Sequence, residues 1–480
     1  MSNNTQNNQG KKIKIVTELD DDDSEEDEKK EKSEIKKENN TDLENRKEKN
    51  EIDSPYYSDE VRKIYKISSS PIISEISIIT AKSILPSNRC YLTAEFSKKN
   101  NSIICIGGSD DKCVQYNKIT EYDLSRNIWR FWKGNEQSEM GIELSGHSSN
   151  LITLNGEEKI FLFGGYDNWK KEFTGQSYFV NIKLKNFEKI NYYNSFDNNN
   201  ELPLPRTYHS SNYDKDKNVI YIYGGTDMNI NHCKGDNFKS LWKFDLINKT
   251  WYKINLEINS QKILSYGVPR GHSSILLNDK LFIFGGVYSF KKFENLMNII
   301  NIKEKKVEAL DYNKDSFKKG CIPDPIAFHS AVLLDEKKIL IHGGLDKRYN
   351  AVNTCYVFHI NEMKFDKINI DLIPNLFGHK IVMNSDMNKL YIIGGMDSFK
   401  YVGDENLIYK IERDQDYIFN KGKVEFFPMK NILEISLKKD LVGESLGETP
   451  PPCEEKTINK NKNSNPNKRI RWKKLFYVNI

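Results

Sequence analysis

The sequence predicts an all-β protein in which one four-stranded unit is repeated six times. Six short apolar runs each end in a Gly-Gly pair, and successive pairs are separated by between 51 and 61 residues. A near-regular interval of this length indicates a repeated supersecondary unit. The pairs are Gly107-Gly108, Gly164-Gly165, Gly224-Gly225, Gly285-Gly286, Gly343-Gly344 and Gly394-Gly395.

The full unit can be followed in the fourth repeat. Residues 272–277 form the predicted first strand, and after a polar turn residues 281–284 form the second, which ends at the Gly-Gly pair. A longer loop leads to two further strands, at 296–302 and 307–310. Four short strands joined by polar turns predict an antiparallel meander. A six-bladed β-propeller gives every such unit two neighbours to pack against.

Ring closure leaves alternatives. Blade six could take its outer strand from near 416–419 or near 424–427. We favour the N-terminal segment 61–67 as the closing strand, because Ile64 to Ile67 matches outer-strand sequences such as 251–254. The predicted organisation is an acidic, Asn- and Lys-rich disordered extension at 1–55, a propeller at 56–430 and an irregular basic tail at 431–480.

Composition favours an intracellular protein with polar extensions. Hydrophobic residues make up 38% of the chain and charged residues 29%, and the net charge is +4, so overall charge points to neither nucleic acid nor membrane. The seven cysteines form no CxxC motif, and no apolar run reaches the ~18 residues that span a bilayer. We expect a cytoplasmic location, with the nucleus as the alternative, no membrane association and an undetermined oligomeric state.

The repeats resemble kelch repeats. A histidine followed by serine begins four of them, the apolar run with Gly-Gly occurs in all six, and an aromatic residue follows at Trp129, Phe187, Trp251 and Phe365. The resemblance covers about residues 85–430 and implies a six-bladed kelch-type β-propeller. It also implies protein recognition, since kelch proteins are mostly adaptors or scaffolds, and a minority, such as the copper-radical oxidases, are enzymes.

Two residue types recur at fixed repeat positions and are interpreted as structural. Metal ligation needs convergent groups at about 2.0–2.1 Å, whereas equivalent positions lie on separate blades, so we expect no metal and no cofactor. Each histidine is expected to hydrogen-bond within its own blade. Aspartates two residues after the Gly-Gly pair, such as Asp167 and Asp346, are expected to accept backbone N–H bonds in the next loop. The histidines are His147, His209, His272, His329 and His379.

The candidate partner-binding residues lie on one face of the ring. Turns after the first and third strands are short, whereas loops after the second and fourth strands are long and belong to the opposite face, where binding usually resides. These long loops combine aromatic residues with cations, which suits acidic protein partners. The candidates are Arg89, Trp169, Lys170, Lys171, Arg206, Arg270, Phe290, Lys291, Lys292, Lys347, Arg348, Tyr349, Phe399, Lys400 and Tyr401.

The predicted function is non-enzymatic protein–protein recognition through this face. The acidic segment 18–28 is a candidate intramolecular ligand, and Ser24 within it is a candidate phosphorylation site. Two alternatives come from other classes: an enzyme that uses the channel of the propeller, and a nucleic-acid-associated factor that uses the basic stretch 468–474. The sequence offers no Ser-His-Asp spacing, phosphate loop or HExxH motif for the first alternative, and nucleic acid is not an expected partner.

Overall fold

A computed structural model describes the repeat region of the chain. Contacts divide the chain into two units, 1–57 and 58–480, and all described residues belong to the second. The backbone alone is described at 193–194, 398–400, 423–426 and 431. The predicted extension 1–55, Ser24 and the tail beyond residue 438 lie outside the described residues. The described ranges are 62–67, 70–83, 86–109, 119–132, 143–167, 169–191, 193–194, 201–229, 232, 235–259, 264, 267–288, 292–295, 297–310, 320–368, 372–400, 423–426 and 431–438.

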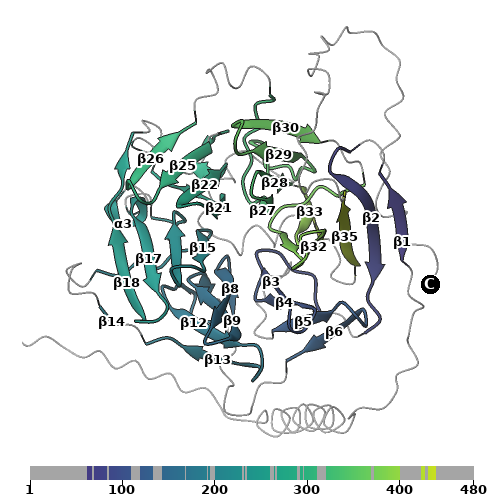
Figure 1. Cartoon of the computed structure of the whole chain (residues 1–480), viewed down its shortest axis with the longest axis horizontal. Helices are drawn as coiled ribbons and strands as arrows, with labels where there is room; N and C mark the ends of the chain where they lie inside the picture. Colours follow the sequence, from purple (N-terminus) through teal and green to yellow (C-terminus); the bar gives the residue numbers. More distant parts are fainter. Residues whose placement is uncertain are drawn as a thin grey trace, which may run out of the picture. The chain divides into compact units, whose positions relative to one another are not determined.

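The described strands form a ring of antiparallel sheets, as predicted (Figure 1). Six sheets of four or five strands occur in the described ranges, and we call them blades one to six in chain order of their inner strands. Each inner strand contacts the inner strands of the two neighbouring blades, in the cycle β3, β8, β15, β21, β27, β31 and back to β3. No helix in the described part of the chain is long and apolar enough to cross a membrane.

Blades one, two and five are four-stranded meanders whose strands pair in chain order. Blade one contains β3 (Thr93–Ser97), β4 (Ser102–Ile106), β5 (Thr120–Asp123) and β6 (Ile128–Phe131). Blade two contains β8 (Ser148–Leu154), β9 (Glu157–Phe163), β12 (Ser177–Asn181) and β13 (Asn186–Lys189). Blade five contains β27 (Ser330–Asp335), β28 (Lys338–His342), β29 (Cys355–His359) and β30 (Lys364–Ile368).

Blades three and four each add a two-residue strand that runs parallel to the outer strand. Blade three contains β15 (Ser210–Asp214), β16 (Val219–Tyr223), β17 (Leu241–Asp245), β18 (Thr250–Ile254) and the added β14 (Tyr193–Asn194), with the short helix α3 (Asp236–Lys239) between β16 and β17. Blade four contains β21 (Ser273–Leu277), β22 (Lys280–Phe284), β25 (Met297–Asn301), β26 (Lys306–Ala309) and the added β19 (Glu257–Ile258).

Blade six joins the two ends of the repeat region. Its order from the channel outward is β31 (Lys380–Met383), β32 (Lys389–Ile393), β35 (Asn431–Leu437), β2 (Ile73–Thr80) and β1 (Lys63–Lys66). β1 lies within the segment predicted to close the ring, but β2 stands between it and the rest of the blade. The predicted propeller boundary at residue 430 is wrong, because the apolar strand β35 is buried between β32 and β2. Residues 423–426 form β34, which pairs with β33 (Met396–Lys400) rather than with blade six.

Short hairpins follow the second strands of several blades. Blade two carries β10 (Tyr166–Asp167) and β11 (Glu172–Phe173), which pair with β7 (Leu144–Ser145) at the start of the blade. Blade four carries β23 (Val287–Tyr288) and β24 (Lys292–Phe293), which pair with β20 (Pro269–Arg270). Because every second strand runs in the same direction, these hairpins and the loop 345–351 emerge on one face of the ring.

The hydrophobic core is divided into clusters between successive blades. In β4, Ile103 and Cys105 belong to the cluster shared with blade six, whereas Ile104 and Ile106 belong to the cluster shared with blade two. Side chains alternate between the two faces of a strand, and both faces are covered here. This is why the second strands read as uninterrupted apolar runs before each Gly-Gly pair.

Candidate functional site

The Gly-Gly pairs connect neighbouring blades. In each pair the second glycine donates its backbone N–H to a carbonyl at the start of the next blade, as in Gly225 N to Pro269 O at 2.9 Å. The first glycine lies against the same carbonyl. A Cβ at Gly224 would stand 2.6 Å from Pro269 O and 2.7 Å from the His272 ring, and its φ is +66°. Only glycine combines this backbone conformation with such a close approach.

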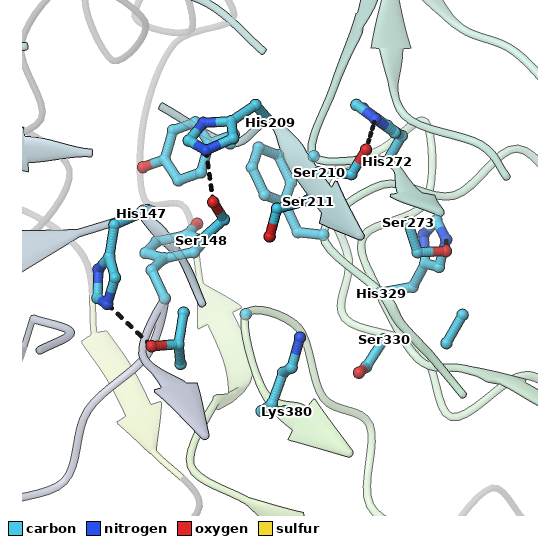
Figure 2. Close-up of a pocket in the computed structure, with 18 of the residues that line it drawn as sticks. His147, Ser148, His209, Ser210, Ser211, His272, Ser273, His329, Ser330 and Lys380 are labelled. Atoms are coloured by element: carbon cyan, nitrogen blue, oxygen red, sulfur yellow. Dashed lines mark hydrogen bonds between the residues drawn. The ribbon is translucent and has the colours of Figure 1, made fainter. Parts of the chain in front are cut away.

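The repeated histidines join neighbouring blades, so the prediction of hydrogen bonds within single blades is wrong. Each histidine precedes the inner strand of its blade and therefore faces the inner strand of the preceding blade. Figure 2 shows Nε2 of these rings bonded to hydroxyl groups of that strand. The pairs are His147 with Thr93 at 2.9 Å, and His209 with Ser148, His272 with Ser210 and His329 with Ser273 at 2.8 Å. His379 instead meets Nδ1 of His342 at 3.1 Å.

Burial keeps these rings neutral at physiological pH. It lowers the pKa of His147 and His329 to about 3 and that of His272 to about 4. Within the described ranges, no group of three or more His, Cys, Asp or Glu side chains is arranged to hold a metal ion. The rings therefore act as hydrogen-bonding links between blades.

One end of the channel is closed by a circle of backbone hydrogen bonds and three aromatic rings. Six residues that precede the histidine position, which is Leu92 in blade one, each donate their backbone N–H to a carbonyl of the preceding blade. They are Tyr91, Gly146, Tyr208, Gly271, Phe328 and Gly378, with N–O distances of 2.6–3.1 Å. The rings of Tyr91, Tyr208 and Phe328 contact one another with centroids 5.1–5.6 Å apart. Glycine alternates with these rings because a Cβ at Gly271 would lie 2.8 Å from the Phe328 ring.

A central cavity of about 170 Å³ lies beside this aromatic plug (Figure 2). Its wall consists of the inner-strand hydroxyls and the histidines that bind them. In blade six the hydroxyl position is occupied by Lys380, whose side chain points into the space between the inner strands. In blade one the histidine position is occupied by Leu92.

Two predicted partner-binding residues are structural. Arg89 and Arg206 are 1% and 0% exposed. Nη1 of Arg89 donates to Gly107 O at 3.2 Å, and Nη1 of Arg206 donates to Gly224 O at 3.1 Å. Both guanidinium groups thus satisfy carbonyls of the Gly-Gly pairs, which leaves them inaccessible to a partner. Sequence position alone placed them on the correct face but could not show their depth.

The remaining described candidates lie on the surface that we call the hairpin face, formed by 166–167, 169–173, 269–270, 287–288, 292–293 and 345–351. Trp169 is 81% exposed at the tip of the blade-two hairpin, beside the exposed Lys170 and Lys171. Lys347 and Arg348 are exposed on the blade-five loop, and their charged groups have no ion-pair partner among the described residues. Tyr349 is half-buried and packs on Phe293 with ring centroids 5.2 Å apart, so its ring supports the loop. Lys292 is exposed in β24, and Arg270 is half-buried in β20.

Five predicted residues have no described side chain. Phe290, Lys291 and Tyr401 lie outside the described residues, and Phe399 and Lys400 are described only as backbone of β33. Three of the aspartates after the Gly-Gly pairs, Asp167, Asp227 and Asp346, accept backbone N–H bonds in the next loop as expected. Oδ1 of Asp346 accepts the N–H groups of Arg348 at 2.8 Å and Asn350 at 2.9 Å, which shapes the loop that presents the cations.

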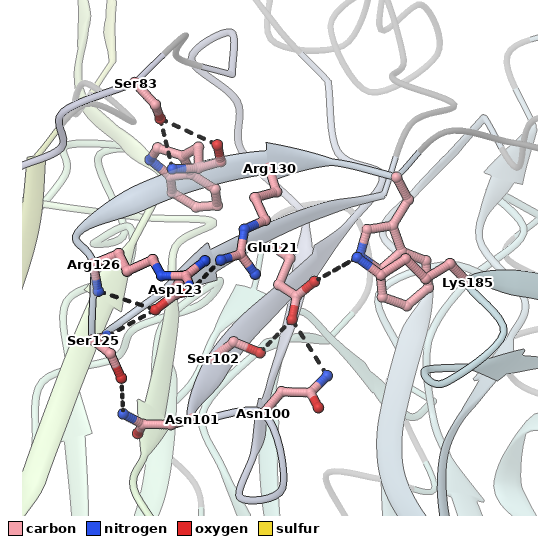
Figure 3. A network of polar contacts seen from close by, with 12 residues as sticks. Ser83, Asn100, Asn101, Ser102, Glu121, Asp123, Ser125, Arg126, Arg130 and Lys185 are labelled. Atoms are coloured by element: carbon pink, nitrogen blue, oxygen red, sulfur yellow. Dashed lines mark hydrogen bonds and ion pairs between the residues drawn. The ribbon is translucent and has the colours of Figure 1, made fainter. Parts of the chain in front are cut away.

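A second hollow, of about 520 Å³, is lined by residues of blades one and two near the short turns. Its buried acid, Glu121, accepts hydrogen bonds from Ser102 Oγ at 2.7 Å and Trp132 Nε1 at 3.1 Å (Figure 3). It also accepts longer bonds from Lys185 Nζ and Asn100 Nδ2, both at 3.4 Å. Burial raises the pKa of Glu121, but these bonds outweigh it and leave the pKa below its ordinary value. A carboxylate satisfied by four donors is a structural anchor between blades.

Two features of the ring were missed from the sequence, although both leave a trace in it. The residues before the repeated histidines alternate between glycine and an aromatic residue, as in Gly146, Tyr208, Gly271 and Phe328. This alternation could have indicated the aromatic plug. The replacement of serine by Lys380 after the last repeated histidine could have indicated a blade that differs from the others.

Comparison with known proteins agrees with the repeat architecture of the ring. Residues 146–395 match the KLHDC2/KLHL20/DRC7 Kelch-repeats domain. The chain is 22% identical over 327 residues to Mei4-dependent protein 6 of Schizosaccharomyces pombe. That similarity covers 62% of this chain and 44% of the length of the yeast protein.

Proposed function

Because this chain belongs to the kelch-repeat family of the KLHDC2/KLHL20/DRC7 domain, a family of protein-interaction modules, we propose that it is a non-enzymatic adaptor or scaffold. In this proposal the hairpin face binds an acidic segment of a protein partner. The observation that carries the proposal is Trp169, a large apolar side chain that is 81% exposed at a hairpin tip beside cations.

The energetic argument starts from this exposed indole. Tryptophan and arginine are enriched among residues that dominate binding energy, because they bury large areas and make directional contacts. An indole held in water by a hairpin gains free energy when a partner covers it. The hairpin is fixed at its base, where Tyr166 packs on Phe173 with centroids 5.2 Å apart. Little conformational entropy is therefore lost when the face binds.

The charges on this face suit an acidic partner. Lys347 and Arg348 are exposed without an ion-pair partner in the described part of the chain, and Lys170 makes only a long ion pair with Asp167, at 3.7 Å. Such cations remain available to steer and bind carboxylates or phosphates. The acidic segment 18–28 of the same chain has the required chemistry, and phosphorylation of Ser24 would increase its charge.

The proposal is tested with a labelled peptide of residues 18–28 and the propeller that lacks residues 1–55. Fluorescence anisotropy at low ionic strength is expected to show saturable binding that weakens with added salt. Trp169→Ala and the double reversal Lys170→Glu with Arg348→Glu should each weaken binding by about tenfold or more. A peptide phosphorylated at Ser24 should bind more tightly.

The matched control reverses two exposed lysines on the opposite face. Lys98 and Lys303 lie in the short turns after β3 and β25, so Lys98→Glu with Lys303→Glu gives the same change in net charge at a distant place. Equal weakening by both double reversals would contradict a site on the hairpin face. In parallel, proteins captured by the full chain from cell extract should be lost with the hairpin reversals and retained with the control.

A further inference from the structure

Lys380 is the exception in the wall of the central cavity. In the other five blades the equivalent residue carries a hydroxyl, and Thr93, Ser148, Ser210 and Ser273 use it to bind a histidine. Lys380 has no such partner, because Leu92 replaces the histidine of blade one. Among the residues that the structure describes, its ammonium group makes no hydrogen bond or ion pair. Figure 2 shows this side chain directed into the cavity.

Two hydroxyl groups that line the same cavity as Lys380 also keep a proton to donate. Ser330 Oγ accepts the N–H of Ile381 at 3.0 Å, and Ser274 Oγ accepts the side-chain amide of Asn212 at 2.5 Å. Both serines line the cavity, and accepting a bond leaves each O–H free to point elsewhere. Blades four, five and six therefore contribute an ammonium group and two hydroxyl donors to one space.

One acid faces the same region. Glu95 in β3 accepts a hydrogen bond from Ser149 Oγ at 2.5 Å. Burial raises the pKa of Glu95, and the charge of Lys380 acts in the opposite direction without a direct ion pair between the two groups. The same positive charge adds to burial in lowering the pKa of His147 and His379. The field of Lys380 thus extends across the cavity and is not cancelled by a salt bridge.

We propose that the central cavity binds one small oxyanion of phosphate or sulfate size, with Lys380 as its counter-charge and Ser330 and Ser274 as hydrogen-bond donors. One water needs about 10–15 Å³ of such space, so a cavity of about 170 Å³ has room for a polyatomic anion with some water. The aromatic plug of Tyr91, Tyr208 and Phe328 closes the channel at one end. The ligand enters from the end with the short turns, so this site is separate from the hairpin face.

The test is isothermal titration calorimetry of the full chain with sodium phosphate and sodium sulfate at constant ionic strength. We expect saturable binding of one anion per chain. Lys380→Gln should weaken it by about tenfold to a hundredfold, since a charge-assisted hydrogen bond is lost. Lys303→Gln, at an exposed turn, removes the same charge and should leave binding unchanged. Methyl phosphate and glycerol phosphate form a second arm, in which retained binding assigns the site to phosphorylated metabolites and lost binding assigns it to the free anion.

Two further variants keep the proposal testable if Lys380→Gln fails to fold. Ser330→Ala should weaken binding by about threefold to tenfold, because one donor is lost. Glu95→Gln should tighten it, because the opposing acid becomes neutral. Absence of saturable binding to the wild-type chain, or equal affinities for Lys380→Gln and Lys303→Gln, would overturn the proposal. The same holds if Glu95→Gln weakens binding.

Discussion

Two kinds of joint between blades can be compared, apart from the joint of blades five and six, where His379 meets His342 instead of a hydroxyl. At the four joints between blades one and five, a histidine of one blade bonds to a hydroxyl of the preceding blade. At the joint between blades six and one, Leu92 and Lys380 stand at these two positions and no such bond exists. The backbone bonds are nevertheless kept, with Gly395 N 2.9 Å from Arg89 O and Tyr91 N 2.8 Å from Gly378 O.

The difference shows that the bond between histidine and hydroxyl can be replaced, whereas the backbone bonds are kept at both kinds of joint. Blade six is built from both ends of the repeat region, and β2 contributes to two cores: Ile76 packs toward blade five and Ile79 toward blade one. Strand pairing between distant segments assembles blade six, and the apolar core that it shares with blade one supports the joint of these two blades. A hydroxyl or a histidine left alone in a buried site would cost free energy, so the absence of both partners is less costly than the absence of one.

The largest expected effect comes from breaking the closing strand. Ile76 in β2 is 0% exposed, so Ile76→Asn would bury an amide without partners and leave a cavity. We expect it to lower the free energy of unfolding by about 4 kcal/mol or more. Ile64→Asn is the matched control, because Ile64 in β1 of the same sheet is 54% exposed and should change stability by less than about 0.5 kcal/mol. Urea unfolding monitored by tryptophan fluorescence measures both, and similar losses would contradict closure through β2.

The next largest effect is expected from lowering the pH, which should weaken the joints that contain a buried histidine. Burial lowers the pKa of His147 and His329 to about 3 and of His272 to about 4, whereas a histidine in the unfolded chain has a pKa near 6.5. Below about pH 6.5 the unfolded chain therefore binds protons that the folded chain excludes. The contribution of the neutral histidines to the free energy of unfolding should be fully present above that pH. It should fall toward about pH 4 by roughly 1.4 kcal/mol per pH unit for each histidine.

Urea midpoints measured at several pH values test this expectation. The joint of blades six and one contributes no histidine to this slope, because Leu92 stands at the histidine position. A variant that lacks His272 should show a slope smaller by about 1.4 kcal/mol per pH unit. A stability that stays constant between about pH 7 and pH 5 would show that the rings are not held neutral by burial.

Local sequence patterns were sufficient to predict the blades, because each uses a short meander with its own turns. The strands of the fourth repeat, for example, differ from those predicted by about one residue. Contacts between distant segments were harder to predict. β2 has no repeat motif, and β35 follows the last repeat at a distance, so only the folded ring shows that they pair. For the same reason the depth of Arg89 and Arg206 could not be deduced from spacing.

Glycine substitutions should show that the backbone contacts of the Gly-Gly pairs support both kinds of joint. A Cβ at Gly224 would stand 2.6 Å from Pro269 O, and a Cβ at Gly395 would stand 2.7 Å from the His379 Cβ. Gly224→Ala and Gly395→Ala should each cost about 2–4 kcal/mol. Both introduce backbone strain, and the added Cβ displaces the next blade at Gly224 and His379 of the same blade at Gly395. Gly156→Ala is the control, because Gly156 also has positive φ but has open space at the Cβ position, and it should cost about 1 kcal/mol. A mild effect at Gly395 alone would mean that the joint of blades six and one is held differently in its backbone as well.

The smallest effect comes from converting an ordinary joint into one that resembles the joint of blades six and one. His272→Leu would leave Ser210 Oγ without its ring partner, and Ser210→Ala would leave His272 Nε2 unpaired, so each should cost about 1–3 kcal/mol. The double variant should cost about 1 kcal/mol less than the sum, since neither polar group then remains alone. A double-mutant cycle by urea unfolding measures this coupling. Strictly additive losses would mean that the histidine supports the joint through the volume of its ring, and that the loss of both partners beside Lys380 needs another explanation.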